Sequence, residues 1–508
     1  MPTYLSPGVY IEEVASGSKP IEGVGTAVAA FVGMAPKGPP NQPTLITNWR
    51  QYVEKFGDIT SGAYLGHAVY GYLLNGGGNC YVVRVGANDS NGDNVEQSPA
   101  RARIGALEVR ALEAGPAGND TTVEVTAPPE GSPEGTVRIV ITRGDEREEH
   151  EALPLSGRGN VVNTLNRSRL VRVELEEGVG QLDDLPFGIT SLSGGELVHV
   201  DVTQARLSPD EYIGDSADRT GFGGLETIPD VTMVCVPDAM AAYQKGVIDL
   251  EGLKSIQLGM IAHCELMGNR IAVLDAPPSM NAQQVMDWRM DQAGYDSKFA
   301  ALYWPWVKVF DPSSGENTFV PPSGHVAGIW GRNDDTRGVH KAPANEVVRG
   351  AIDLELNISK GEHDLLNPVA VNCLRAFPGR GIRIWGARTL SSDPEWRYLN
   401  VRRLFNYLEE SILNGVQWAV FEPNDQVLWA KVRRTIAAFL TMEWRKGALF
   451  GTTPNEAFFV KCDGETNPAE AIDLGQLTCE VGVAPVKPAE FVIFRLSQFS
   501  GGASLVAE

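Results

Sequence analysis

Hydrophobic and polar positions follow two different periods along this chain, and together they predict a mixed fold. The run GTAVAAFVGMAPKGP, residues 25–39, is a buried-strand pattern that ends in a Gly/Pro-rich loop. A helix is predicted to start near Thr47 and to stop at Gly57, and YLGHAVYGYLLNGGG predicts a second helix closed by glycines. The β-branched run CYVVRV then predicts a short strand.

The same alternation of strands and helices resumes at Pro229. Three strands, VTMVCVP, IAVLDAPP and AALYWPWVKVF, are separated by helical runs at residues 241–268 and 282–292. Strands that alternate with helices predict a mostly parallel sheet covered on both faces. We expect the strands before residue 87 to belong to this same sheet.

Between these two parts the pattern changes to short alternating segments. LEVRAL, TTVEVTA, GTVRIVITR and LVRVELEE are separated by clusters of Gly, Pro and Asn. Such spacing is typical of an all-β module. Because it interrupts the α/β pattern, we interpret it as an insertion.

The last third of the chain begins near Pro343. It contains the strand GIRIWGART and two amphipathic helices predicted at residues 394–414 and 425–446. Strict alternation returns in PAEFVIFRLSQFS, close to the C-terminus. The opening MPTYLSPGVYIEEV alternates in the same way, so both ends are strand-capable and neither has a partner nearby in sequence.

These patterns predict an α/β core, with a mostly parallel sheet and helices on both faces, that carries an inserted all-β domain and an α+β C-terminal domain. Extended strand arms are predicted at both ends. The expected boundaries are an N-terminal arm at 1–20, the first part of the α/β domain at 21–86, the inserted β-rich domain at 87–215, the second part of the α/β domain at 216–342, the C-terminal domain at 343–488 and a C-terminal arm at 489–508.

The charge distribution excludes one class of function and divides the chain. A formal net charge of -21 argues against a protein held on nucleic acid by phosphate contacts. The stretch from Ala87 to Asp201 contains 21 acidic and 10 basic residues, whereas the stretch from Val371 to Ser392 contains four arginines and no carboxylate. The sequence has no apolar run of about 20 residues and no secretory pattern at its start, so we expect it to fold in the cytoplasm.

Few residues carry the signature of chemistry. There is no phosphate-binding G-x-x-x-x-G-K-[ST] loop, no G-x-S-x-G elbow and no pair of histidines at metal-ligand spacing. Six widely spaced cysteines fit a reduced compartment. Asp238 and Asp275 end predicted strands, where α/β enzymes place functional groups, but their proline neighbours favour a loop-capping role. We therefore predict no catalytic residues, no metal and no cofactor, although spacing alone leaves a Ser/His/Asp triad open.

Three co-linear blocks resemble contractile tail sheath proteins. The first is YLSPGVYIEEV with PIEGVGTAVAAFVGMAPKGP, the second is VPPSGHVAGIWGRNDDTRGVHKAPANE at residues 320–346, and the third is LNPVAVNCLRAFPGRGIRIWGARTL followed by WRYLNVRRLFNYLEESI. They occur in the order of the family and cover both ends and the middle of the chain. The length and the β insertion resemble the larger sheaths of phage tails and of phage-derived contractile injection systems.

The resemblance implies a structural machine. Subunits of this family form six-membered rings, stacked as a helical sleeve around an inner tube, and the sleeve contracts when the baseplate triggers it and drives the tube into a target membrane. The implied partners are neighbouring sheath subunits, the inner tube protein, and baseplate and terminal cap proteins, with neither nucleic acid nor direct membrane insertion. Assembly is expected in the cytoplasm of the producing bacterium, as part of a phage tail or a phage-tail-like particle.

The terminal arms are expected to add themselves as strands to the sheets of neighbouring subunits. The arm residues that the resemblance assigns to this role are Tyr4, Val9, Tyr10, Ile11, Val14, Phe491, Ile493, Phe494, Leu496 and Phe499. The inserted domain, with Phe187 as its single aromatic residue from Ala87 to Asp201, is expected to be an outward-facing decoration.

The C-terminal domain is expected to face the tube, and one helix is the candidate for the contact. In QVLWAKVRRTIAAFLTMEWRKG, Lys431, Arg434 and Arg445 fall within about 60° of arc, and Lys446 follows them. Leu428, Val432, Ile436 and Phe439 form a separate apolar face that should pack on the domain core.

Two alternatives remain open at this stage. One is an α/β hydrolase-like enzyme with an inserted β domain, which would be a soluble oligomer of defined size. The other is a non-contractile structural component of a virion, against which the terminal arms and the three co-linear blocks count.

Overall fold

The structure, a computed structural model, describes residues 20–86, 95–97, 99–144, 146–157, 159–175, 182, 184–195, 197–199 and 207–495. The chain divides into two compact units, each described here by itself. The first contains Met1–Ala35, Asn41–Val85 and Arg206–Glu508, and the second contains Pro36–Pro40 and Gly86–Ala205. The insertion was expected to run to residue 215, but helix α4 (Pro209–Ile213) packs against helix α6 (Leu250–Met267) in the first unit.

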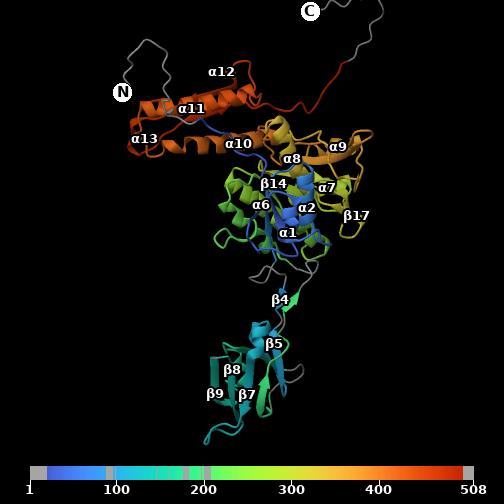
Figure 1. The fold of residues 1–508 in the computed structure, drawn as a ribbon, viewed down its shortest axis with the longest axis vertical. Coiled ribbons are helices and arrows are strands. Elements are labelled where there is room, and N and C mark those ends of the chain that lie inside the picture. Colours follow the sequence, from blue (N-terminus) through green and yellow to red (C-terminus); the bar gives the residue numbers. More distant parts are fainter. Residues whose placement is uncertain are drawn as a thin grey trace, which may run out of the picture. The chain divides into compact units, whose positions relative to one another are not determined.

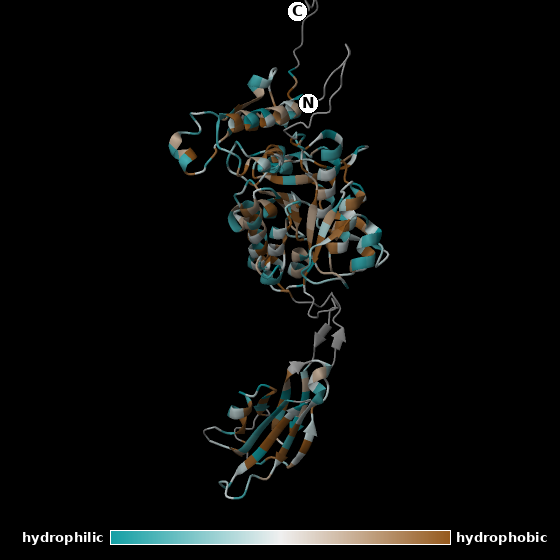
Figure 2. Ribbon diagram, turned by 60° about the vertical axis from the view of Figure 1, so that its left-hand side comes forward, coloured by the Kyte–Doolittle hydropathy of each residue, from teal (hydrophilic) through white to brown (hydrophobic). Residues whose placement is uncertain are grey.

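An eight-stranded sheet forms the centre of the first unit (Figure 1). The five inner strand pairs are parallel and the two outer pairs are antiparallel. All residues of β1, β13, β14 and β15 are buried, so both faces of these strands are covered, and Figure 2 shows hydrophobic residues along them. In sheet order the strands are β2 (Thr44–Ile46), β3 (Cys80–Arg84), β1 (Ala29–Gly33), β13 (Met233–Cys235), β14 (Ile271–Asp275), β15 (Ala300–Trp304), β19 (Val371–Phe377) and β20 (Gly381–Ile384).

The helices of this core begin and end where local chemistry dictates. Helix α1 (Trp49–Phe56) begins after Asn48, whose side chain accepts a hydrogen bond from the Gln51 N–H, and it ends at Gly57 as predicted. The predicted helix at 241–268 is wrong, because Gly246 at φ 67° ends one helix and Asp249 caps the next. The other helices are α2 (Leu65–Leu74), α5 (Asp238–Gln244), α7 (Ala282–Asp287) with the π-helix η4 (Trp288–Ala293), α8 (Ser323–Arg337) and α9 (Lys360–Leu366).

The predicted strand AALYWPWVKVF is also wrong as a single element. Pro305 has no N–H to donate and divides it into β15 of the central sheet and β16 (Val307–Asp311). Strand β16 instead pairs with β17 (Glu316–Val320) and β18 (Asp353–Leu354) in a small antiparallel sheet.

The C-terminal part contains two long helices that lie side by side (Figure 1), α10 (Leu399–Val416) and α11 (Gln426–Arg445). Helix α10 was expected from residue 394. It starts later because Thr389 binds the backbone of Trp396 and Arg397, which folds residues 389–397 into a loop. Helices α12 (Pro454–Ala457) and α13 (Ala469–Asp473) and the hairpin of β21 (Phe458–Lys461) and β22 (Glu480–Val483) complete this part.

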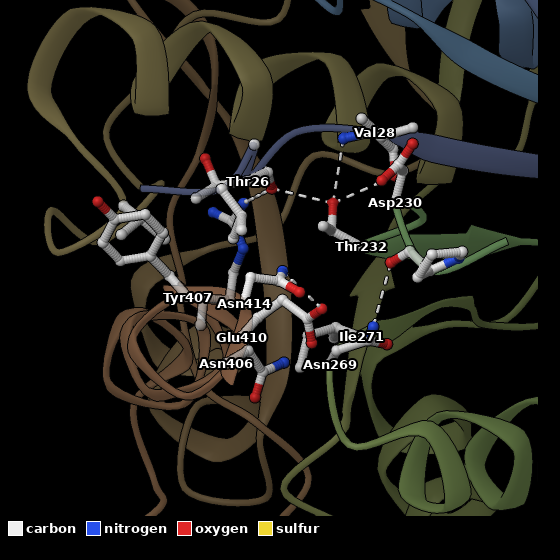
Figure 3. Close-up of a pocket in the computed structure, with 15 residues that line it drawn as sticks. Thr26, Val28, Asp230, Thr232, Asn269, Ile271, Asn406, Tyr407, Glu410 and Asn414 are labelled. Carbon is white, nitrogen blue, oxygen red and sulfur yellow. Dashed lines mark hydrogen bonds between the residues drawn. The ribbon is translucent and has the colours of Figure 1, made fainter. Parts of the chain in front are cut away.

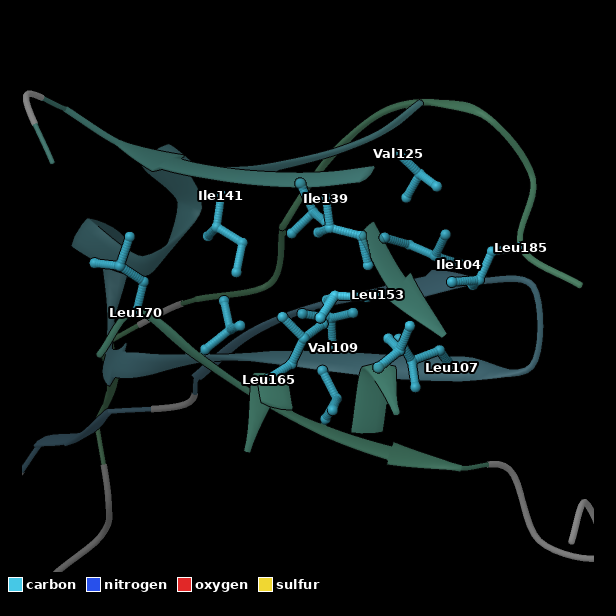
Figure 4. Close-up of a cluster of buried hydrophobic side chains, with 14 of the residues drawn as sticks. Ile104, Leu107, Val109, Val125, Ile139, Ile141, Leu153, Leu165, Leu170 and Leu185 are labelled. Carbon is cyan, nitrogen blue, oxygen red and sulfur yellow. The ribbon is translucent and has the colours of Figure 1, made fainter. Parts of the chain in front are cut away.

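The second unit is built from antiparallel strands around its own core of aliphatic side chains (Figure 4). Strands β6, β7, β8 and β10 match the four predicted segments, whereas β9 was missed because its sequence EREEHEALP is too charged to alternate clearly. The elements are β4 (Val95–Gln97), β5 (Pro99–Ile104), β6 (Leu107–Ala114), β7 (Thr121–Thr126), β8 (Thr136–Arg143), β9 (Glu146–Pro154), α3 (Val161–Leu165), β10 (Val171–Leu175), β11 (Gly188–Ser191) and β12 (Leu197–His199).

Two aspartates at the carboxyl edge of the central sheet cap other elements, which confirms the capping role expected for them. Asp238 accepts hydrogen bonds from the backbone N–H groups of Met34, Tyr64 and Leu65. Asp275 accepts from the N–H of Ser323, the first residue of α8, at 2.8 Å. Burial raises the pKa of Asp238 to about 6 and that of Asp275 to about 7. The edge of the sheet at which α/β enzymes usually react is thus occupied by structural contacts.

A buried ion pair joins three distant parts of the first unit. The guanidinium of Arg403 on α10 donates to both carboxylate oxygens of Asp334 on α8, at 3.0 and 2.6 Å, and the two side chains are 4% and 3% exposed. Arg403 also donates to the carbonyl of Thr26 at 3.0 Å, while the Thr26 hydroxyl donates to Asp334 at 2.7 Å. The chain segment before β1 is therefore clamped between the two helices.

We expect Arg403→Met to lower the free energy of unfolding by about 3–5 kcal/mol, because Asp334 would remain as a buried carboxylate without its cation. Urea unfolding of the dispersed subunit measures this. The control is Lys360→Met, which removes an exposed ion pair with Asp364 and should cost at most about 1 kcal/mol. Equal losses in the two variants would contradict the clamp.

We expect Asp275→Asn to remove part of the pH dependence of stability. The folded pKa near 7 lies above the ordinary value of 3.8, so the contribution of Asp275 is complete below pH 3.8 and is lost as the pH rises through 7. Between pH 5 and 8.5 the wild type should lose about 2–3 kcal/mol relative to the variant, in urea unfolding at each pH. Asp311→Asn is the control: burial would raise the pKa of Asp311, but hydrogen bonds from Ser313 and Ser314 hold it below 3.8, so its contribution is lost only at acidic pH and the variant should not change the pH dependence between pH 5 and 8.5.

Candidate functional site

The stretch that the sequence predicts as the C-terminal arm is bound to the body at Glu490. Its carboxylate accepts hydrogen bonds from Nε and Nη2 of Arg388 at 2.8 and 2.7 Å, and from Asn367 and the Tyr398 hydroxyl at 2.9 and 3.3 Å. Burial alone would raise the pKa of Glu490, but the bonds from Arg388 and Asn367 outweigh it and hold the pKa below its usual value. The carboxylate therefore stays charged and anchored.

Immediately after this anchor the chain exposes an apolar run. Phe491, Val492, Ile493 and Phe494 are 70%, 69%, 78% and 84% exposed, and residues 491–495 belong to no strand. Four consecutive large apolar side chains in water are unusual for a folded protein and indicate a surface that a partner covers. The other predicted arm residues, Tyr4, Val9, Tyr10, Ile11, Val14, Leu496 and Phe499, lie outside the described residues.

The β21–β22 hairpin offers strand edges close to the same domain. Among the described strands, β21 and β22 pair only with each other, and Phe459 on β21 is 59% exposed. An open groove of about 640 Å³ runs between α11 and β21, lined by Ala430, Arg433, Arg434, Ala437, Asn455, Phe458, Phe459 and Val460. The sequence pattern did not single out this hairpin, because its strands are only four residues long.

The base of the N-terminal arm is also fixed on the C-terminal helices. Ile21 is 3% exposed and packs in the core of α10 and α11, and the Val24 N–H donates to the hydroxyl of Ser411 on α10 at 3.1 Å. The segment around Ile21 is thus held on α10 and α11, whereas Glu490 is held by Asn367, Arg388 and Tyr398, which precede α10.

A pocket of about 160 Å³ lies beside this N-terminal segment (Figure 3). The Thr232 hydroxyl donates to the carbonyl of Thr26 at 3.0 Å on one wall, and Glu410 and Asn414 of α10 form another. Asp230, Thr232 and Ile271 stand at the amino ends of β13 and β14. This is the edge opposite to the one where parallel α/β sheets bind substrates, and the pocket belongs to the junction between domains.

Helix α11 presents the two faces predicted for it. Leu428, Val432, Ile436 and Phe439 are buried, at 7%, 3%, 2% and 1% exposed, which confirms the apolar face. The four predicted contact cations differ from one another. Arg434 and Arg445 are exposed and have no ion-pair partner among the described residues, whereas Lys431 lies over the ring of Trp418 and Lys446 pairs with Glu443 at 2.8 Å.

The basic stretch from Val371 to Ser392 does not act as one surface. Arg388 is the anchor of Glu490, while Arg375 and Arg380 lie over the ring of Phe377 on the β19–β20 hairpin. The sequence showed that this stretch is rich in arginine. It did not show that Arg388 binds Glu490 while Arg375 and Arg380 lie over the ring of Phe377.

In the described parts of the chain, no helix combines the length and the apolar character needed to cross a membrane. Nor do three or more His, Cys, Asp or Glu side chains gather there in a way that could hold a metal ion.

Comparison with known proteins places the chain. Residues 233–390 match the phage tail sheath protein central domain and residues 391–499 match the phage tail sheath C-terminal domain, together more than half of the chain. The tail sheath protein of Burkholderia phage BcepMu is 24% identical over 509 residues, covering 96% of this chain and 95% of that protein. The tail sheath protein of Vibrio phage KVP40 is 22% identical over 61% of this chain, and the chain spans 43% of its length, about half.

The fold agrees with these matches. The helical sheath of the anti-feeding prophage in its contracted state superposes with a TM-score of 0.61 at 24% identity, covering 98% of this chain and 100% of that one. The chain belongs to the contractile phage tail sheath protein family.

Proposed function

We propose that this chain is the structural subunit of a contractile sheath in a phage tail or a phage-tail-like injection particle. Copies polymerise as stacked six-membered rings around an inner tube, and contraction drives the tube through a target membrane. The partners are neighbouring copies, the inner tube protein, the baseplate and the terminal cap, and the particle assembles in the cytoplasm of the producing bacterium. The observation that supports this best is the exposed run Phe491–Phe494 behind an anchored Glu490.

The arms are proposed to connect the subunits by strand addition. An extended segment gains main-chain hydrogen bonds from a strand edge and places alternate side chains on the two faces. The β21–β22 hairpin is the acceptor that we infer, because its ladder is short and the groove between α11 and β21 can take apolar side chains. Each hydrogen bond contributes about 0.5–1.5 kcal/mol, so five or six per arm give a firm joint.

Because the start of each proposed arm is fixed to the body, the arms could transmit force between subunits while the sheath contracts. Ile21 holds the start of the N-terminal arm on α10 and α11, and Glu490 holds the start of the C-terminal arm on residues that precede α10, so a pull on either arm would reach the body. Ser16, Gly17 and Ser18 lie outside the described residues and are proposed as the joint at which the body rotates. Since the sequence has no nucleotide-binding loop, the energy of contraction would be stored in the packing of the assembled lattice and released by rigid-body rotation.

The tube contact is proposed for the exposed face of α11. Arg434 and Arg445 are its main cations, because both are exposed and have no ion-pair partner among the described residues. Lys431 and Lys446 support them from positions already held by Trp418 and Glu443. Exposed ion pairs are worth at most about 1 kcal/mol each, which suits a contact that must be released. The second unit is proposed as an outward decoration, with Phe187 its exposed aromatic side chain.

We expect Ile493→Pro to abolish tube formation while the subunit stays folded, because proline removes a ladder N–H and disfavours the strand. Deletion of residues 1–14 should have the same effect. Negative-stain microscopy and sedimentation velocity of the purified protein measure assembly, and circular dichroism measures folding. Phe450→Ser removes an equally exposed apolar side chain outside the arm and should leave tubes intact. Normal tubes from Ile493→Pro would refute the arm assignment.

We expect the double variant Lys431→Glu and Arg445→Glu to form empty sheaths but to lose co-assembly with the inner tube protein, because neither residue lines the groove between α11 and β21 that Arg434 lines. Co-sedimentation of tube and sheath at several salt concentrations measures the contact, and in the wild type it should weaken as salt screens exposed charges. The control, Arg50→Glu with Lys55→Glu, makes the same change in charge on exposed positions of α1. Loss of co-assembly in both double variants would show a general charge effect instead.

A further inference from the structure

Two cysteines stand opposite each other at the end of the β21–β22 hairpin where the connecting loop begins and ends. The antiparallel register pairs Phe458 with Val483 and continues to Lys461 with Glu480. One step further along both strands, Cys462 faces Cys479. This pair is separated in sequence by a loop that contains α13, and nothing in the cysteine spacing of the sequence indicated it.

The hydrogen-bond pattern identifies the kind of position that this pair occupies. The Ala484 N–H donates to the Ala457 carbonyl at 2.8 Å, so 457 and 484 form a hydrogen-bonded pair. Hydrogen-bonded and non-hydrogen-bonded pairs alternate along an antiparallel ladder, which makes 462 and 479 a non-hydrogen-bonded pair. At such positions the Cα atoms lie about 4.5 Å apart, within the range of about 4.4–6.8 Å that a disulfide requires.

The side chains are already in contact. The two thiols lie close enough to influence each other's pKa, and both cysteines are in the reduced form. Cys462 is 1% exposed in the core shared with α10 and α11, while Cys479 is half-buried at its margin and is the side from which a reagent can approach.

A buried asparagine holds the loop closed next to the pair. Asn467 is 2% exposed, accepts a hydrogen bond from the Thr478 N–H at 2.7 Å and donates to the Thr478 carbonyl at 3.0 Å. Its amide also lies 3.9 Å from Sγ of Cys462. The backbone on both sides of the pair is thus fixed, so linking the two sulfurs requires little movement.

We propose that Cys462 and Cys479 are a modification site that forms an intrachain cross-strand disulfide when the protein meets a small-molecule disulfide. One thiolate attacks the reagent and releases a reagent thiol, leaving a mixed disulfide. The second cysteine then attacks the protein sulfur and releases the other reagent thiol. Two protein thiols are oxidised to one disulfide, and one molecule of reagent disulfide is reduced to two thiols.

The burial of the two thiols and the redox state of their surroundings determine when the disulfide forms. Burial raises the pKa of both thiols, that of Cys479 to about 12, so little thiolate is present near neutral pH and exchange is slow. In a reducing cytoplasm the pair stays reduced, and it is oxidised after prolonged exposure outside it. The link would close the loop beneath the proposed acceptor of the arms; this consequence, unlike the disulfide itself, rests on the proposed function.

The test is oxidation of the folded full-length protein with oxidised glutathione, followed by counting thiols after denaturation. We expect two of the six thiols to disappear with no glutathione retained. A protease that cleaves after glutamate cuts between the two cysteines at Glu465 and Glu470, and the unreduced digest should then contain a linked pair of peptides. The other cysteines, Cys80, Cys235, Cys264 and Cys373, are fully buried and should remain as thiols.

Two variants keep the result interpretable. Cys462→Ser and Cys479→Ser should each lose the link, and neither should lose another thiol to an alternative intrachain disulfide. Six remaining thiols in the native wild type, under conditions that oxidise the urea-unfolded chain, would overturn the proposal, as would a link to any other cysteine.

A second measurement follows the consequence of the link. Proteolysis of residues 463–478 in the folded protein should be on the order of a hundredfold slower after oxidation, because the link removes open conformations of this loop. If proteolysis were unchanged in protein shown to carry the disulfide, the disulfide would not be holding this loop closed. A disulfide that forms in protein unable to build tubes would leave this site standing while refuting the proposed function.

Discussion

The buried ion pair between Arg403 and Asp334 is the contact on which the first unit depends. It joins α10 to α8, and through Thr26 it includes the segment that connects the N-terminal arm to β1. Two charges removed from water are stable only if each remains satisfied, so the three parts must stay together or separate together. The helical part against which Ile21 packs is in this way connected to the sheet through α8.

The α/β core supports this connection structurally. Its carboxyl edge is occupied by Asp238 and Asp275, whose hydrogen bonds position α2 and α8. Helix α8 in turn supplies Asp334, so the order of the sheet edge reaches the ion pair through one helix. A sheet of this type commonly leaves that edge open for a ligand, and here the same positions hold the fold together.

Sequence patterns predicted the elements that neighbouring residues determine. They failed where a contact between residues far apart in sequence, or a single backbone group, determines the structure. The cap of α1 and the buried face of α11 follow from neighbouring residues, and both were predictable. The division of the strand at Pro305 was missed, although a proline without an N–H breaks a ladder, because the sequence is apolar on both sides of it. The pairs Arg403–Asp334, Arg388–Glu490 and Cys462–Cys479 join residues far apart in sequence, and no period records them. The pattern of PAEFVIFRLSQFS predicted a strand-capable segment, while only the structure showed that Glu490 anchors it.

A comparison of energies shows why the anchors matter for a sheath. An arm paired by five or six main-chain hydrogen bonds is held by roughly 3–8 kcal/mol. If its base were held less firmly, a pull would peel the arm from its own body before it moved the neighbour. Glu490 meets this requirement through a two-pronged bond to Arg388, two further donors and partial burial, since its side chain is only 19% exposed. Ile21 meets it through apolar packing, which is not weakened by salt. In the proposed sheath, deformation would concentrate between each anchor and its paired strand, and rotation there would leave both joints intact.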